Sequence, residues 1–156
     1  MTSSLLEATG LRKGFGDGPV LDGIDLDIGR SEIVALLGPN GAGKSVLLSC
    51  LAGDAVPDSG RVRVFDQYDP VDRPARLHSS VLLQGRTADP DLTGRENIAF
   101  YGDLHPRWTD RWEDLVERFD LAADLDRPVT EYSGGMVRKL ELTIALTPDV
   151  PLYLLD

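Results

Sequence analysis

The first third of the chain alternates between apolar and polar residues in short runs, which is the pattern of β-strands. Between residues 24 and 28, three apolar side chains alternate with two aspartates, so this segment predicts a strand with one face toward solvent. Residues 5–15 and 61–65 have the same strand character, and turn residues lie between the runs. We therefore expect an N-terminal region that is rich in strands, with antiparallel character.

The pattern changes at residues 32–53. Residues 32–37 are a short apolar run of strand type, which ends where a glycine-rich segment begins. Residues 46–52 follow as a helix candidate. Gly53 is placed to end that helix, because glycine readily adopts the left-handed conformation found after helix C-termini. A strand, a glycine-rich loop and a helix are therefore expected in succession.

The middle of the chain predicts a polar loop, a strand and two helices. Residues 66–76 have loop character, and residues 80–83 form a short buried strand. Thr93, with Glu96 three residues later, is a capping box that opens the first helix. The second helix spans residues 110–119, with its large apolar residues on one side.

The last part of the sequence predicts one more helix and one more strand. Ser133 is suited to cap a helix that continues to residue 147, and apolar residues one turn apart give that helix a buried line. Pro148 ends the helix because proline cannot continue the backbone hydrogen bonding. Residues 151–155 form an apolar strand, and Asp156 is the last residue.

Length and composition narrow the class of protein. At 156 residues the chain predicts about one domain with a sizeable core. A formal net charge of −10 argues against a nucleic-acid partner held by bulk electrostatics, because such binding needs a basic face. The single cysteine excludes an intrachain disulfide, and no Cys/His spacing suggests a zinc site. No apolar run approaches the roughly 18 residues of a membrane span, so any membrane role is expected to need a partner chain.

Residues 38–45 carry the most specific chemistry in the sequence. They match the phosphate-loop pattern G-x-x-x-x-G-K-[ST] at every fixed position, as Gly38, Pro39, Asn40, Gly41, Ala42, Gly43, Lys44 and Ser45. Glycines let the backbone N–H groups approach a phosphate, and the following helix N-terminus adds positive partial charge. We expect Lys44 to reach the outer phosphates and Ser45 to offer its hydroxyl to Mg²⁺. The alternative is a chance glycine-rich turn.

Gln84 is a second candidate for the site. It follows the strand predicted at residues 80–83. Ligand groups in open α/β sheets lie at the carboxyl ends of strands, so this position favours a ligand contact. The alternative is an ordinary polar residue at the end of a strand.

These features occur in a fixed order: phosphate loop, strand-end glutamine, helical insert, Tyr-Ser-Gly-Gly at a helix start, and an apolar strand ending in Asp. Over the whole chain this order resembles the nucleotide-binding domain of ATP-binding cassette (ABC) transporters. The sequence of the helical insert and around the Tyr-Ser-Gly-Gly segment is similar to that of the ATPase subunits of multidrug or antibiotic exporters. The resemblance implies an α/β fold with a P-loop NTPase core of the ABC ATPase type, an N-terminal antiparallel β region and a helical insert. The expected single domain has its core at residues 1–84 and 136–156 and its insert at about 85–135, with the C-terminal part of the fold missing.

The resemblance also implies roles for individual residues. Phe15 corresponds to the aromatic residue that stacks on adenine. Catalytic roles fall on Lys44, Gln84 and Asp156, and contacts with Mg²⁺ fall on Ser45, Gln84 and Asp156. The nucleotide contacts fall on Phe15, Gly38, Pro39, Asn40, Gly41, Ala42, Gly43, Lys44, Ser45 and Val46, and those to a γ-phosphate held by the opposing subunit on Ser133, Gly134 and Gly135.

Three positions depart from the family pattern. Val46 stands where the family usually has a threonine whose hydroxyl reaches the α-phosphate, and Met136 replaces the common glutamine of the signature. The sequence also ends at Asp156, before the glutamate that the resemblance implies as the general base. We therefore expect Val46 to weaken nucleotide contact, and the 156 residues alone to bind ATP weakly without hydrolysing it.

The resemblance implies an ATP-binding subunit that couples ATP binding and hydrolysis to export through separate transmembrane permease subunits. Its expected ligands are ATP and Mg²⁺. Its expected partners are the permease and a second ATP-binding subunit in a head-to-tail dimer, and nucleic acid is not expected. The expected location is cytoplasmic, on the inner face of the cell membrane. Two alternatives stay open: a soluble ABC-type ATPase that is not linked to transport, and an inactive fragment of either protein.

Overall fold

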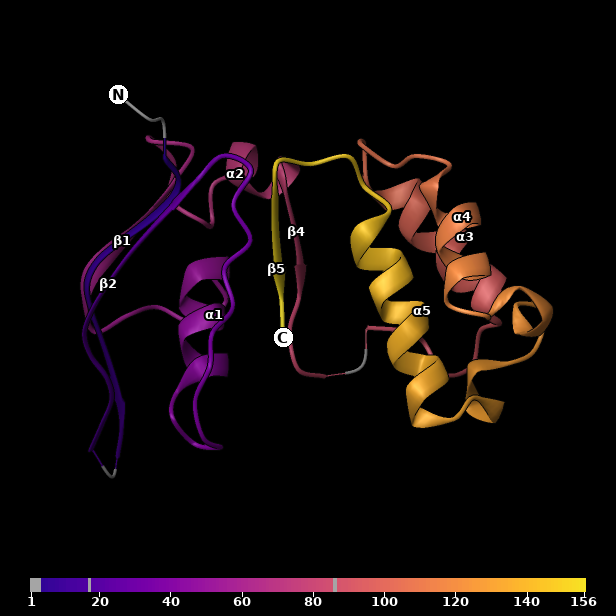
Figure 1. Ribbon diagram of the computed structural model, residues 1–156, viewed down its shortest axis with the longest axis horizontal. Coiled ribbons are helices and arrows are strands. Elements are labelled where there is room, and N and C mark those ends of the chain that lie inside the picture. The colour runs from indigo at the N-terminus through magenta and orange to yellow at the C-terminus, as the bar shows by residue number, and fades with distance from the viewer. Residues whose placement is uncertain (1–3, 17, 86) are drawn as a thin grey trace. The chain divides into compact units, whose positions relative to one another are not determined.

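The computed structural model describes residues 4–16, 18–85 and 87–156. The chain divides into two compact units (Figure 1). The first unit comprises the described residues up to Ser79 together with Leu154–Asp156, and the second comprises the described residues of Ser80–Tyr153. The first unit is built around an antiparallel sheet, and the second is mainly helical.

Three antiparallel strands form the sheet of the first unit in the order β2-β1-β3. Leu6 in the central strand lies opposite Ile28 on one side and Val64 on the other. Leu6 and Leu11 have no exposed surface. The predicted antiparallel region is therefore confirmed, and its strands are β1 (Ser4–Phe15), β2 (Gly18–Gly29) and β3 (Ser59–Val64).

Helix α1 (Lys44–Ala52) packs against β1 and β2. It buries Leu47, Cys50 and Leu51. Gly53 ends the helix in the left-handed conformation, with φ of 80°, and its N–H donates to the carbonyl of Cys50. Both the helix and the residue predicted to end it are confirmed.

The strand predicted at residues 32–37 is wrong. These residues follow the turn after β2 as irregular backbone, and Ile33 and Leu37 are 101% and 90% exposed. A strand persists only when its N–H and C=O groups find a neighbouring strand. In the sheets of the described residues, no strand pairs with this segment. The apolar run therefore has strand composition without the ladder that would make it a strand.

The polar loop predicted at residues 66–76 also needs correction, because it contains the start of helix α2 (Arg73–Leu77). Pro74 lies in the first turn, where its fixed φ suits a helix and its missing N–H costs nothing. The strands predicted on either side of the helical region are both present. They are β4 (Ser79–Leu82) and β5 (Leu152–Leu155), which pair in a two-stranded sheet.

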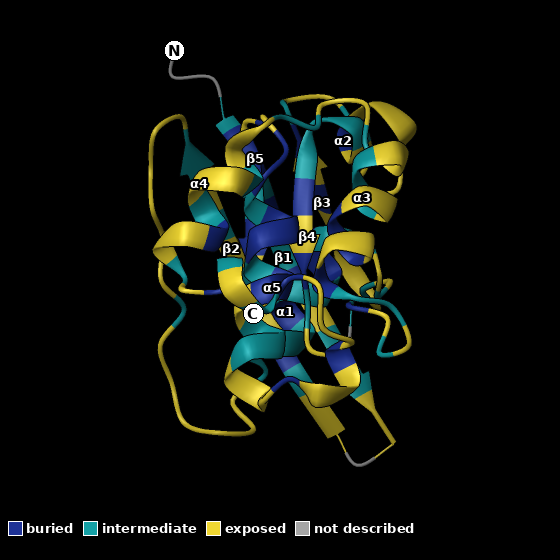
Figure 2. Ribbon diagram, turned by 90° about the vertical axis from the view of Figure 1, so that its right-hand side faces the viewer, coloured by how far each residue is buried: buried dark blue, intermediate teal, exposed yellow. Residues whose placement is uncertain are grey.

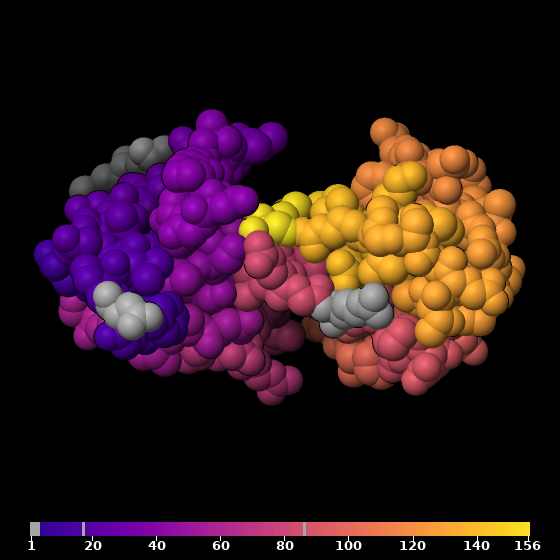
Figure 3. Space-filling model, turned by 90° about the horizontal axis from the view of Figure 1, so that it is seen from below, coloured from indigo at the N-terminus to yellow at the C-terminus, as the bar shows by residue number. Residues whose placement is uncertain are grey.

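Besides parts of β4 and β5, the described residues of the second unit form three helices and two short 3₁₀ turns, η1 (Ala122–Asp124) and η2 (Val129–Glu131). The later half of α5 is buried, whereas α3 and α4 are largely exposed (Figure 2). Helices α4 and α5 pack against each other, and their residues form one continuous surface in Figure 3. None of the helices that the structure describes is long and apolar enough to cross a membrane. The helices are α3 (Gly94–Leu104), α4 (Arg111–Arg118) and α5 (Gly134–Leu146), and their shared core is Ala88, Ile98, Val116, Leu121, Leu125, Val129, Tyr132, Leu140 and Ile144.

The start of α3 confirms the predicted capping box. The Thr93 hydroxyl accepts the Glu96 N–H at 3.1 Å, and the Glu96 carboxylate accepts the Thr93 N–H at 2.8 Å. Each residue therefore satisfies a backbone donor that the first helical turn leaves unpaired. The Glu96 carboxylate accepts hydrogen bonds from the Thr93 N–H and, at 2.9 Å, from the Thr93 hydroxyl, and these two bonds lower the pKa of Glu96.

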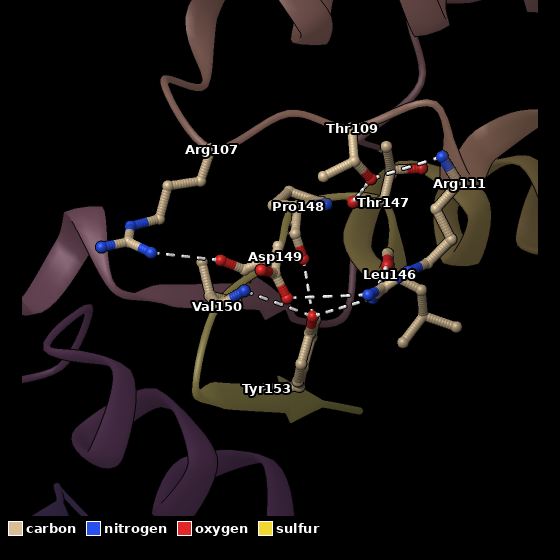
Figure 4. Close-up of polar contacts among 9 residues, drawn as sticks. All are labelled: Arg107, Thr109, Arg111, Leu146, Thr147, Pro148, Asp149, Val150 and Tyr153. Atoms are coloured by element: carbon tan, nitrogen blue, oxygen red, sulfur yellow. Dashed lines mark hydrogen bonds and ion pairs between the residues drawn. The ribbon is translucent and has the colours of Figure 1, made fainter.

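The loop between α5 and β5 is held by side chains, as Figure 4 shows. The Tyr153 hydroxyl donates to the carbonyl of Pro148 at 2.6 Å. Thr109 donates to the carbonyl of Thr147 at 2.7 Å, and Arg111 donates to that of Leu146 at 3.3 Å. The final carbonyls of a helix have no partners within the helix, so these contacts fix the point at which α5 gives way to β5.

Candidate nucleotide-binding site

The phosphate loop takes a shape that requires two of its glycines. Gly41 and Gly43 have φ of 82° and 87°, in the left-handed region that other residues rarely adopt. A Cβ atom on Gly43 would also lie 2.9 Å from Cγ1 of Val20 in β2. Gly43 is therefore needed both for its backbone angle and for the close approach of the loop to the sheet. Gly38 has neither constraint, because its only Cβ neighbour would be Ala42 at 3.4 Å.

Helix α1 begins without a side-chain cap. Gly43 is its N-cap residue, and the first turn contains no acidic side chain. The first N–H groups of a helix have no partner within it and carry positive partial charge. The start of α1, with Lys44, Ser45 and Val46 in its first turn, therefore presents donors suited to an anion.

Lys44 closes the loop on itself. Its ammonium donates to the carbonyls of Gly38 at 2.9 Å and Pro39 at 2.8 Å. Both acceptors are neutral and exposed to solvent, so phosphate oxygens are the stronger partners for this charge. Asn40 and Ala42 are exposed in the turn of the loop, where the Ala42 N–H donates to the carbonyl of Pro39 at 3.2 Å.

Phe15 lies at the end of β1 and is 58% exposed, so its ring is accessible to a stacking partner. The Lys13 ammonium lies 5.6 Å from the centre of that ring. Asp58 holds Lys13 through an ion pair of 2.9 Å and accepts the Gly14 N–H at 2.7 Å. The hydrogen bond from Lys13, followed by that from Gly14, lowers the pKa of Asp58. The sequence did not predict this ion pair, because Lys13 and Asp58 are 45 residues apart.

Gln84 is exposed, in the bend that follows β4. Beyond it, a groove of about 400 Å³ is lined by Thr87, Ala88, Asp89, Pro90, Asp91, Leu92, Asn97, Phe100 and Tyr101. Asn97 fixes one wall of this groove from a fully buried position, because its side chain accepts the Asp89 N–H at 2.8 Å and donates to the Asp89 carbonyl at 3.0 Å. Sequence reasoning missed the groove, and the only local signal was the helix start at Thr93.

A second helix start carries Ser133, Gly134 and Gly135. The Ser133 hydroxyl accepts the Met136 N–H at 3.2 Å, which confirms the predicted N-cap. A Cβ atom on Gly134 would meet nothing within 4 Å, so the first turn of α5 is open to solvent. The buried Tyr132 anchors this turn by donating its hydroxyl to the carbonyl of Asp124 at 2.8 Å.

Asp156 follows the last residue of β5. Its Oδ2 atom is buried and has no hydrogen-bond partner among the described residues. A buried carboxylate oxygen is unfavourable without a donor or a cation, so this oxygen fits a Mg²⁺ ligand. The described residues contain no cluster of three acidic, His or Cys side chains that could hold a metal ion. That absence is compatible with Mg²⁺, which binds through one or two carboxylates, substrate phosphates and water.

The structure brings residues 38–46 together as one loop and helix start. Phe15 and Asp156 stand on other elements of the same unit, and Gln84 and residues 133–135 belong to the second unit. The roles of these residues toward a nucleotide therefore stay predictions. The helix starts after Gly43 and Ser133 lie where the sequence indicated, whereas the strand expected before Gly38 is absent from the described residues.

Comparison with known proteins agrees with this geometry. The sequence model of the ABC transporter family matches residues 21–156. The daunorubicin resistance ATP-binding protein DrrA3 of Streptomyces coeruleorubidus is 38% identical over 162 residues, which cover 100% of this chain and 51% of that protein. The Nod factor export ATP-binding protein I of Bradyrhizobium diazoefficiens is 35% identical and is covered to 53%. The chain thus spans about half the length of these curated relatives.

Solved structures show the same fold. The ATP-binding subunit of an ABC transporter matches with a TM-score of 0.83 at 27% identity, over 96% of this chain and 65% of the other. The cbiO1 protein of Clostridium perfringens matches with a TM-score of 0.72 at 23% identity and supports the fold alone. The fold is therefore that of an ABC ATPase subunit, as the sequence predicted. Because the family match extends from β2 to the end of the sequence, the chain belongs to the ABC transporter family.

Proposed function

We propose that this chain is part of an ATP-binding subunit that couples ATP binding and hydrolysis to export through separate membrane subunits. The observation that carries the proposal is the start of α1, which lacks a side-chain cap and follows a loop shaped by Gly41 and Gly43. Membership of a nucleotide-binding family and similarity to relatives named for drug resistance and Nod factor export support it.

The proposed chemistry assigns each residue a task. The first N–H groups of α1 bind the phosphates, and Lys44 exchanges its two carbonyl acceptors for phosphate oxygens. Ser45 and Asp156 would hold Mg²⁺, which would supply positive charge beside the phosphate oxygens. Gln84 contacts the attacking water, and Phe15 stacks on adenine. Catalysis then rests mainly on positioning and charge neutralisation.

The proposed partner at the start of α5 is a second ATP-binding subunit. Gly134 and Gly135 are exposed, and the Ser133 hydroxyl occupies only the Met136 N–H. A helix N-terminus with such small residues suits a γ-phosphate that is held by another subunit. This arrangement makes the working unit a head-to-tail dimer with two bound ATP molecules.

The groove beside α3 is the proposed docking site of the membrane subunit. Its lining combines the aromatic ring of Phe100, which is half exposed, with the acidic side chains of Asp89 and Asp91. A short segment with an apolar residue and a basic residue has the matching chemistry. The subunit therefore works at the inner face of the cell membrane, on the cytoplasmic side.

Binding of ATP to matched lysine variants tests the proposal. Lys44→Ala should weaken the binding of Mg·ATP by about tenfold or more, because a charge-assisted contact with phosphate is lost. Lys139→Ala, which removes an exposed lysine from α5, should leave the affinity unchanged within about twofold. Isothermal titration of both variants and the wild type measures the difference. Equal affinities for Lys44→Ala and the wild type would contradict the assignment of the phosphate loop.

A further inference from the structure

Helix α5 contains a buried carboxylate that the proposed chemistry does not use. Glu141 is only 3% exposed and lies two turns beyond Ser133 on the same helix. Burial of a carboxylate is unfavourable unless hydrogen bonds or an opposite charge compensate it. A position that served only packing would be filled better by an apolar residue. The partners of Glu141 therefore show what the carboxylate does.

The first partner is the backbone of Thr87. Oε1 of Glu141 accepts the Thr87 N–H at 2.7 Å, across 54 residues of sequence. The second partner is Arg138, whose guanidinium lies 3.4 Å from Oε2 of the same carboxylate and is partly exposed. The short charge-assisted hydrogen bond to Thr87 is the stronger contact, so the carboxylate mainly holds the chain segment at Thr87.

A side chain from another helix holds the same residue. The Tyr101 hydroxyl, from α3, donates to the carbonyl of Thr87 at 2.8 Å. Burial raises the pKa of Tyr101, so its hydroxyl keeps the proton that it donates. Both backbone polar groups of Thr87 are thus satisfied by side chains, one from α5 and one from α3. Such double anchoring is the usual way to fix an irregular segment, because the backbone there has no ladder of its own.

Thr87 connects the Gln84 segment with the wall of the groove. It lies three residues after Gln84, and it lines the groove together with Tyr101. The segment from Gln84 to Thr87 has no regular secondary structure in its described residues, so these side chains fix its end. Through one residue, the wall of the groove is tied to the helix that begins after Ser133.

We propose that Glu141 and Tyr101 are positioning residues that clamp Thr87 and thereby hold the Gln84 segment to helices α3 and α5. The functional meaning rests on the proposed function, since Gln84 is assigned there to the attacking water. The clamp is expected to make Gln84 and the start of α5 move as one part. Neither residue touches nucleotide in this account; each acts through the backbone of Thr87.

Amide hydrogen exchange of the 156-residue chain tests the clamp without reference to ATP. Glu141→Ala should raise the exchange rate of the Thr87 amide by about tenfold, because the N–H loses its acceptor. Glu141→Gln keeps an oxygen acceptor and should restore most of the protection. Glu117→Ala, which removes an exposed glutamate from α4, is the matched control and should change nothing. An unchanged Thr87 rate in Glu141→Ala overturns the proposal.

Tyr101→Phe covers the case in which Glu141→Ala does not fold. It removes one oxygen, and it should raise exchange at Thr87 while the urea midpoint of unfolding stays close to that of Glu141→Gln. A folded Tyr101→Phe protein with wild-type exchange at Thr87 contradicts the clamp.

Turnover by the full-length subunit supplies the functional readout. Glu141→Ala should lower kcat by about tenfold with the KM for ATP unchanged within about twofold, since a positioning defect affects the chemical step and spares ground-state binding. Glu141→Gln should recover most of the rate. If the wild-type subunit does not hydrolyse ATP, the proposed function fails. The exchange rates of the Thr87 amide then test the clamp by themselves. If the wild type is active and Glu141→Ala keeps its kcat, the positioning role fails.

Discussion

Helices α1 and α3 begin in opposite ways. The first turn of α3 is satisfied from within the chain, because Thr93 and Glu96 accept each other's backbone N–H groups. The first turn of α1 has Gly43 as its N-cap, no side-chain acceptor and no acidic residue. A helix that supplies its own acceptors is complete without a ligand. A helix that supplies none leaves its donors available to an anion, so the comparison supports the proposal that α1 binds the nucleotide.

Helix α5 lies between these two cases. Its Ser133 hydroxyl accepts one N–H, and its first two residues are glycines, of which Gly134 has open space where a Cβ atom would lie. This start is only partly capped by a side chain, and the buried Tyr132 lies directly before its N-cap residue. The three starts therefore form a series, from the fully capped α3 through the partly capped α5 to α1, which has no side-chain cap.

The largest effect is expected at Gly43. Gly43→Ala places a Cβ atom against Val20 and forces alanine into a left-handed conformation, so we expect a loss of about 2 to 4 kcal/mol in the free energy of unfolding. ATP binding should be lost as well. Gly134→Ala is the matched control at the start of α5, where the added atom meets nothing within 4 Å. Urea unfolding of both variants makes the comparison, and equal stabilities would show that the shape of the loop is not imposed by Gly43.

A smaller effect is expected at the capped helix. Thr93→Ala removes the hydroxyl cap of α3 and should cost about 1 kcal/mol of unfolding free energy at neutral pH, with ATP affinity unchanged. Because the pKa of Glu96 is lowered in the folded protein, the difference in unfolding free energy between the wild type and Thr93→Ala should depend on pH. A carboxylate with a lowered pKa stabilises the fold above its ordinary pKa and loses that contribution as the pH falls through its folded value. The gap between wild type and Thr93→Ala should therefore narrow in acid, and a gap that widens would contradict the role of Glu96.

The smallest effect is expected at Val46, in the first turn of α1. Val46→Thr adds a hydroxyl where the nucleotide phosphates are proposed to bind, and it should tighten Mg·ATP binding by about two- to fivefold through one added hydrogen bond. Titration calorimetry measures the change. Val46→Ala is the control, because it changes the size of the side chain without adding a hydroxyl. An equal gain in Mg·ATP affinity in that variant would show that the effect does not come from a hydrogen bond between the hydroxyl and phosphate.

Local signals explain what the sequence could predict. Gly53, the pair Thr93 and Glu96, and Ser133 each act within a few residues, and the structure places all of them as expected. Gly41 and Gly43 of the phosphate loop belong to the same group, because the spacing of the motif places glycine where the backbone needs a positive φ angle. The nucleotide contacts assigned to these residues stay predictions.

Features that depend on distant partners could not be predicted. Residues 32–37 have the composition of a strand, but pairing decides whether a strand forms, and no strand of the described sheets pairs with them. The ion pair of Lys13 with Asp58 joins residues 45 positions apart, and the contact of Glu141 with Thr87 joins residues 54 apart. From the sequence alone, an acidic residue in a helix predicts a position exposed to solvent. Only the structure shows that Glu141 is buried and accepts the Thr87 N–H.

The comparison of helix starts is tested most directly by backbone amide NMR of the chain as Mg·ATP is added. We predict that the amides of Lys44, Ser45 and Val46 shift most, because their N–H groups are proposed to bind the phosphates. The amides of Arg95 and Glu96 at the capped start of α3 should stay in place. Shifts that centre on α3, or equal shifts at both helix starts, would contradict the claim that α1 is the helix that binds the nucleotide.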